Sequence, residues 1–173
     1  MNVKTLLLPS ILFTSCCHVY AGLGNRTAEI SLNPSVKIVN EQGGSGIEIV
    51  PDKKEYTTVY DVGAGTFLPM AMGFNVVSTK STPIKYELNL NVQNYCREEG
   101  KNDDKRMIGV KYLLDGKPVS ASSTTNEITA GVFSTSNEKW HELKYKFPIL
   151  LQDNTFKTCY GFVGITARLS NTY

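Results

Sequence analysis

The chain has 173 residues and a formal net charge of +2, from 18 basic and 16 acidic side chains. This near balance, with no basic stripe along the sequence, favours neither a nucleic-acid-binding protein nor one that binds an anionic membrane surface. The length suits one domain with a substantial hydrophobic core.

The first 21 residues are typical of a secretory signal peptide. Lys4 supplies a positive start, residues 6–13 are mostly apolar, and Ala21 is a small residue after which a signal peptidase would cut. The apolar run is too short to cross a bilayer. The sequence therefore predicts export, with residues 22–173 as the mature chain. An alternative is a lipoprotein that carries its lipid on Cys16.

Residues 28–38 alternate strictly between apolar and polar side chains. The apolar positions are the even-numbered residues Ala28, Ile30, Leu32, Pro34, Val36 and Ile38. Such alternation predicts a half-buried strand, and eleven extended residues span roughly 35 Å. Pro34 removes a backbone donor, which a strand with neighbours on both sides tolerates poorly. The glycine-rich residues 43–46 that follow predict a flexible hinge.

The rest of the chain repeats this period of two, and helical periodicity is nearly absent. Strands are expected at residues 47–50, 56–60, 70–78, 84–92, 107–114, 128–134, 143–151 and 163–169. Asp115 and Gly116 form a strong two-residue turn signal, with residues 117–121 returning as the second strand of a hairpin. Many short strands separated by turn residues predict an all-β fold, a β-sandwich.

Removal of the signal peptide leaves two cysteines, Cys96 and Cys159. An even pair in an exported domain indicates a disulfide. Because the bond would close a loop of about 63 residues, the chain-entropy model gives a stabilisation of about 4 kcal/mol. The alternative is a reactive or metal-binding thiol.

Catalysis finds no support in the sequence. His141 is the single histidine of the mature chain, so no pair of histidines can bind zinc, and a triad would need it beside a suitable nucleophile. A structural or surface role is expected for it. The charged residues 97–106 lack the ligand spacing of a calcium loop, and a solvated loop is expected there, with a receptor-contacting loop as the alternative. We therefore expect no enzyme, no metal and no cofactor.

The two ends of the chain resemble the fimbrial subunits of the chaperone–usher pathway. In pattern the chain is most similar to the colonisation-factor-type pilins of enteric bacteria. The similarity lies in the alternating N-terminal strand with its Asn33-Pro34 step and in the strong final strand at residues 160–169. It spans the signal, both terminal strands and the overall size. In many pilins the disulfide ties strands early in the domain, whereas Cys159 here precedes the last strand.

This resemblance implies an immunoglobulin-like sandwich that lacks its last strand. Residues 22–42 would be a donor-strand extension and hinge, and residues 43–173 the pilin domain. The donated strand would fill a groove on a neighbouring subunit, beside the final strand with its apolar residues Val163, Ile165, Ala167 and Leu169. A periplasmic chaperone would cover this groove until the outer-membrane usher joins the subunits into a surface fimbria. The fimbria would support adhesion to a host receptor.

The main alternative is a self-contained β-sandwich, secreted or lipid-anchored, that binds its ligand as a monomer. In that case residues 28–38 pair within their own sheet.

Overall fold

The computed structural model describes residues 29–38 (their backbone course and pairing), 46–79, 83–123, 125–150 and 157–170. These residues form twelve β-strands and no helix, so none of them belongs to a helix that could cross a membrane. The strands are β1 (Glu29–Ile38), β2 (Ile47–Pro51), β3 (Tyr56–Asp61), β4 (Thr66–Phe67), β5 (Met70–Ser78), β6 (Ile84–Glu98), β7 (Asp104–Arg106), β8 (Lys111–Leu114), β9 (Lys117–Val119), β10 (Glu127–Thr135), β11 (Glu138–Lys146) and β12 (Lys157–Leu169). The predicted all-β fold is confirmed.

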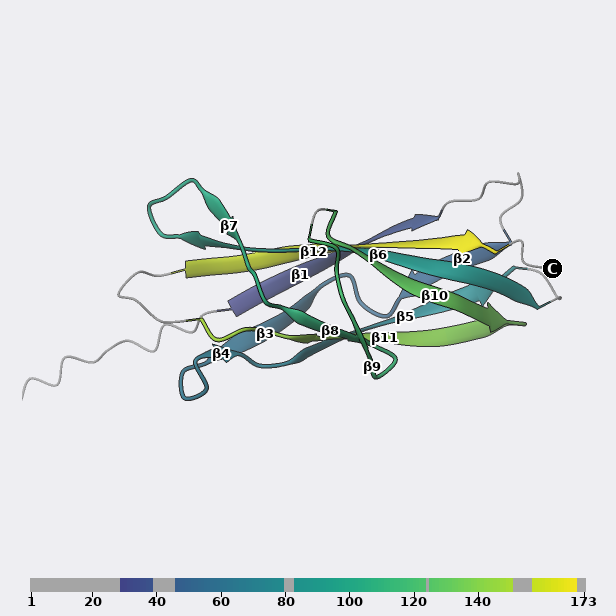
Figure 1. Ribbon diagram of the computed structural model, residues 1–173, viewed down its shortest axis with the longest axis horizontal. Coiled ribbons are helices and arrows are strands. Elements are labelled where there is room, and N and C mark those ends of the chain that lie inside the picture. Colours follow the sequence, from purple (N-terminus) through teal and green to yellow (C-terminus); the bar gives the residue numbers. More distant parts are fainter. Residues whose placement is uncertain (1–28, 39–45, 80–82, 124, 151–156, 171–173) are drawn as a thin grey trace, which may run out of the picture.

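The strands build two sheets that pack face to face (Figure 1). The larger sheet has the order β10-β6-β12-β1-β3-β4, and β7 pairs with the distal part of β6. The smaller sheet has the order β2-β5-β11-β8-β9. The longest pairing joins β6 and β12, antiparallel from Lys157↔Glu98 to Leu169↔Tyr86. These two long strands form the centre of the sandwich.

The apolar residues of the alternating sequence pattern are the residues that the fold buries. In β6 the residues Ile84, Tyr86, Leu88, Leu90 and Val92 are all 8% exposed or less. The residues between them face outward and are exposed or half-buried. Apolar side chains of both sheets meet in one core, because each sheet is apolar on its inner face only.

The hairpin predicted at Asp115 and Gly116 is confirmed. Leu114 pairs with Lys117 across a two-residue loop. The φ angles of Asp115 and Gly116 are 51° and 78°. A type I′ turn requires positive φ at both positions, and aspartate followed by glycine tolerates this best. The returning strand β9 is shorter than predicted and ends at Val119.

Two predicted strand boundaries were wrong. Residues 107–110 belong to no strand; Ile108 is 83% exposed, and Gly109 has a φ of 86°, which interrupts an extended course. β11 covers Glu138–Lys146 instead of residues 143–151. The strand stops before Pro148, which cannot donate to a sheet, and Ile149 beyond it is 72% exposed. Leu151 lies outside the described residues.

The charged residues 97–106 form a hairpin where a loop was expected. β6 continues to Glu98 and the chain returns as β7. Arg97 donates two hydrogen bonds to Asp104, at 2.7 and 3.0 Å. Glu98 accepts hydrogen bonds from Lys101 and Lys105, which lower its pKa to about 2. Asp104 and Glu98 are thus paired with cations of the same hairpin.

Candidate functional site: the strand groove beside β12

The apolar residues predicted for the final strand line the core. Val163, Ile165 and Ala167 have no exposed surface, and they point between the two sheets. Leu169, at the end of β12, is half-buried and packs against the same core. β12 therefore has one apolar face that needs a covered environment along its whole length.

One edge of β12 pairs with β6, and the other edge pairs with β1 (Figure 1). β1 runs parallel to β12, from Ile30↔Cys159 to Ile38↔Ala167. On its far side it runs antiparallel to β3, from Glu29↔Val59 to Leu32↔Tyr56. Within the described residues β12 and β3 do not pair with each other, so β1 fills the position between their two edges. We call this position the strand groove.

The register of β1 matches its apolar alternation. Its even-numbered residues from Ile30 to Ile38 pair with residues 159, 161, 163, 165 and 167, which are the buried positions of β12. Pairing with β3 ends at Leu32, so Pro34 lies where β1 has a partner on the β12 side only. This position tolerates a residue without a backbone donor. In this structure the segment pairs within its own chain; its donation to a neighbour stays a prediction, and Ala28 lies outside the described residues.

The predicted disulfide is present between Cys96 and Cys159, with an S–S distance of 2.03 Å and a Cα–Cα distance of 4.0 Å. The two cysteines are direct partners in the β6–β12 pairing. Cys159 also shares a register position with Ile30 of β1. The disulfide therefore fastens one wall of the groove at the end where β1 enters it.

His141 has the structural role that the sequence predicted, as a fully buried residue that joins the two sheets. Its Nε2 accepts a hydrogen bond from the Tyr86 hydroxyl of the facing sheet at 2.8 Å. Its Nδ1 donates to the Asp115 carboxylate in the β8–β9 turn at 2.8 Å. Phe74 stacks on the ring at 5.3 Å. Burial lowers the pKa of His141, against the opposing effect of Asp115.

The sequence contained a signal for this burial, because His141 lies two and four residues before Leu143 and Tyr145, in the same phase of β11. Its partners Tyr86 and Asp115 are 55 and 26 residues away and carry no such signal.

Within the described part of the chain, no three His, Cys, Asp or Glu side chains gather in a way that could hold a metal ion.

We expect the free energy of unfolding to fall as the pH drops below about 6.5, the ordinary pKa of histidine. The folded state lowers the pKa of His141, so the unfolded chain takes up the proton first and acidification favours unfolding. The stabilisation is fully present above pH 6.5. Urea titrations at pH 7.5, 6.5 and 5.5 measure it.

The matched variant is His141→Gln. It is expected to be less stable than wild type at pH 7.5, because the Tyr86 and Asp115 hydrogen bonds are disturbed. Its stability should change less between pH 7.5 and 5.5. Equal pH dependence of both proteins would show that another group causes the effect.

No protein-family model matches the sequence, and no curated protein matches it. Among solved structures, the N-terminal domain of PorA has 13% identity and a TM-score of 0.33, over 79% of this chain and 88% of that one. The CooA pilin subunit from enterotoxigenic Escherichia coli has 8% identity and a TM-score of 0.27, over 79% of this chain and 97% of that one. At these levels neither neighbour identifies the family of this chain.

Proposed function

We propose that this chain is a structural subunit of a bacterial surface fimbria, in which β1 of each subunit completes the sheet of its neighbour. Residues 22–42 act as donor extension and hinge, and residues 43–173 as an immunoglobulin-like accepting domain. The protein acts by assembly, without catalysis or a cofactor. The observation that carries the proposal is that β1 joins β12 to β3, two strand edges that are otherwise unpaired with each other.

Removal of β1 would divide the larger sheet into β10-β6-β12 and β3-β4. It would also uncover the edge of β12 beside the buried residues Val163, Ile165 and Ala167. The other strand pairings of the sandwich do not involve β1. In the proposed function β1 is a separable element, and the groove that it leaves accepts an extended strand with apolar residues at alternate positions.

Exchange of β1 between subunits conserves the number of strand pairings, since each subunit gives one strand and receives one. Swapping an identical element between copies is therefore a low-cost route to assembly. The chain's own β1 runs parallel to β12 over nine register positions and antiparallel to β3 over four. Parallel pairs are slightly less stable per residue than antiparallel pairs. A donated strand that runs antiparallel to β12 would therefore improve the longer pairing, while its shorter pairing with β3 would become parallel.

The proposal implies specific partners. An uncovered β12 edge would be an aggregation hazard, and a periplasmic chaperone would protect it before assembly. The outer-membrane usher would then join the subunits at the cell surface. Each contact is head to tail and does not close on itself, so it generates an open fibre. Exposed loops at the ends of the sandwich would meet the host receptor.

Two substitutions in β1 test the proposal. Leu32 and Ile38 share register positions with the buried residues Gly161 and Ala167 of β12. Leu32→Arg and Ile38→Arg are expected to abolish fibres counted by electron microscopy, because an unpaired charge is costly in an apolar groove. Both variants should co-purify with the periplasmic chaperone at the wild-type level.

Lys37→Arg is the matched control, since it places the same side chain at a polar position of the strand and should assemble normally. Normal fibre density in Leu32→Arg and Ile38→Arg would refute donation of this strand. Loss of the chaperone complex in these variants would instead place Leu32 and Ile38 in the accepting domain.

The second candidate function is a monomeric secreted or lipid-anchored binding protein. One observation favours it, namely that β1 pairs within its own chain. Light scattering on the purified chain at increasing concentration discriminates between the two functions. A chain that stays monomeric at every concentration, without a chaperone, supports the monomeric protein.

A further inference from the structure

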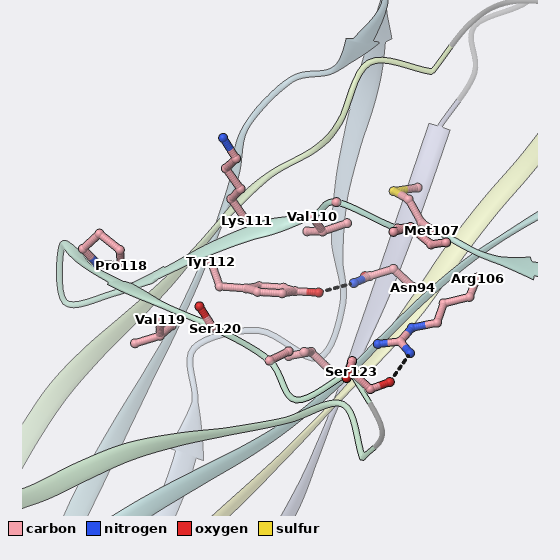
Figure 2. Close-up of a pocket in the computed structure, with 14 residues that line it drawn as sticks. Asn94, Arg106, Met107, Val110, Lys111, Tyr112, Pro118, Val119, Ser120 and Ser123 are labelled. Atoms are coloured by element: carbon pink, nitrogen blue, oxygen red, sulfur yellow. Dashed lines mark hydrogen bonds between the residues drawn. The ribbon is translucent and has the colours of Figure 1, made fainter.

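A cleft of about 720 Å³ opens at the edge of the sandwich where β8 and β9 diverge (Figure 2). Residues Val92 and Asn94 of β6 form its floor. One wall is residues 106–112, and the other is formed by residues of the 118–123 segment. β12 lies between β6 and β1 in the sheet order, so this cleft is separate from the strand groove. Its volume lies in the range of small-molecule sites.

A buried polar pair lies in the middle of the cleft. Asn94 is 3% exposed, and its Nδ2 donates a hydrogen bond to the Tyr112 hydroxyl at 2.8 Å. Figure 2 shows the two side chains pointing toward each other. The amide oxygen of Asn94 is buried and has no hydrogen-bond partner among the described residues. A buried carbonyl oxygen normally has a partner. This oxygen has less than 1 Å² of accessible surface, so a ligand hydroxyl group reaches it only after a small shift of the Asn94 amide.

The charge of the cleft is positive. Arg106 donates to the Ser123 carbonyl at 3.1 Å, which joins one wall to the other (Figure 2). Arg106 is exposed and forms no ion pair within the described part of the chain. None of the described lining residues is acidic. A guanidinium without a carboxylate partner is suited to bidentate binding of an anionic group.

The remaining lining is apolar. Val92 and Met107 are buried at the base, and Val110, Val119 and Ala121 are half-buried along the walls. Ile108 at the rim is 83% exposed, although a large aliphatic side chain gains by being covered. An apolar body of compact shape would remove the exposed surface of Ile108 and the partly exposed walls from water.

We propose that this cleft binds a small amphipathic anion, a molecule with an apolar body, a hydroxyl group and a carboxylate. After a small shift of the Asn94 amide, the hydroxyl donates to its oxygen, the carboxylate pairs with Arg106, and the apolar body packs against Val92, Met107 and Ile108. A neutral apolar compound would leave Arg106 without an anionic partner. A highly polar compound would leave the apolar walls of the cleft exposed to water. The site is independent of strand exchange.

The test uses three matched probes: 3-hydroxyoctanoate, octanoate and 1,3-octanediol. Binding to the full mature chain is followed by ¹H–¹⁵N NMR shifts. We expect 3-hydroxyoctanoate to bind with shifts confined to residues 92–94, 106–112 and 118–123. Octanoate, without the hydroxyl, and the diol, without the charge, are each expected to bind about tenfold more weakly, the order of effect of one hydrogen bond to a neutral or charged partner.

Variants separate the three contacts. Arg106→Gln should lower the affinity for 3-hydroxyoctanoate about tenfold and leave the affinity for the diol unchanged. Asn94→Leu should remove the preference for the hydroxyl. Since Asn94 is buried, its replacement could disturb folding. Ile108→Ser at the exposed rim is a second variant that keeps the fold and should weaken the binding of all three probes. Arg168→Gln, on the outer face of β12, is the control and should bind normally.

The proposal is overturned if 3-hydroxyoctanoate causes no shifts, or if its shifts lie outside these residues. It is also overturned if Arg106→Gln binds the carboxylate as well as wild type does. Equal binding of all three probes would indicate an unspecific apolar surface and would count against it in the same way.

Discussion

Deletion of residues 22–40 is expected to leave a chain that does not fold as a soluble monomer. The deletion removes all of β1, and with it the pairing of β12 from Cys159 to Ala167 and of β3 from Tyr56 to Val59. The sequence predicts four buried aliphatic side chains in this strand, each contributing about 1.5–3 kcal/mol, or about 6–12 kcal/mol together. A domain of this size has a total stability of about 5–15 kcal/mol, so the loss is comparable to the whole.

A peptide of residues 27–38 added in trans is expected to restore the fold if, as proposed, the groove accepts a strand that is not covalently attached. Circular dichroism and size-exclusion chromatography measure the recovery. The control peptide carries arginine at positions 32 and 38 and should not rescue. If the full-length chain is a stable monomer without help, and the deleted chain is unfolded and not rescued by the peptide, β1 is an integral strand and its exchange is excluded.

Loss of the disulfide is the second large effect. The double variant Cys96→Ser with Cys159→Ser is expected to lose about 4 kcal/mol of unfolding free energy. The bond joins positions 63 residues apart, and without it the unfolded chain regains the freedom of a long loop. Urea denaturation, compared at equal pH with the oxidised wild type, gives this difference.

Wild-type protein treated with a reductant is the matched control, because it loses the bond and keeps both sulfurs. It should unfold at a urea concentration near that of the double variant. An unchanged midpoint in both would show that the bond contributes little to stability and that the β6–β12 pairing alone holds this wall of the groove.

Local patterns explain why much of the fold was predictable. A period of two places every second side chain on one face, so the alternation at residues 84–92 and 163–169 predicted the buried faces of β6 and β12. The hairpin at Asp115 and Gly116 was predictable for a similar reason, since its turn needs positive φ at two adjacent residues. The disulfide followed from a count of cysteines in a chain predicted to be exported.

The errors also have physical causes. Apolar residues on both sides of Gly109 read as a continuous strand, yet the left-handed conformation of that glycine interrupts it. The run at residues 143–151 kept its alternation past Pro148, where the sheet cannot continue. In the charged residues 97–106 composition alone indicated a loop, whereas the Arg97–Asp104 pair forms only when two strands face each other.

Sequence alone therefore predicted the all-β class, the apolar faces of the long strands, the tight hairpin and the cysteine pair. The strand faces depend on evenly spaced residues, the hairpin on two adjacent residues, and the cysteine pair on there being only two cysteines after the predicted signal peptide. The tertiary structure decided which strands became neighbours: that β1 lies between β12 and β3, that His141 meets Tyr86 and Asp115, and that three separate segments enclose the Asn94 cleft. These contacts join residues far apart in the chain, and they form only when the two sheets pack and bury their apolar faces together.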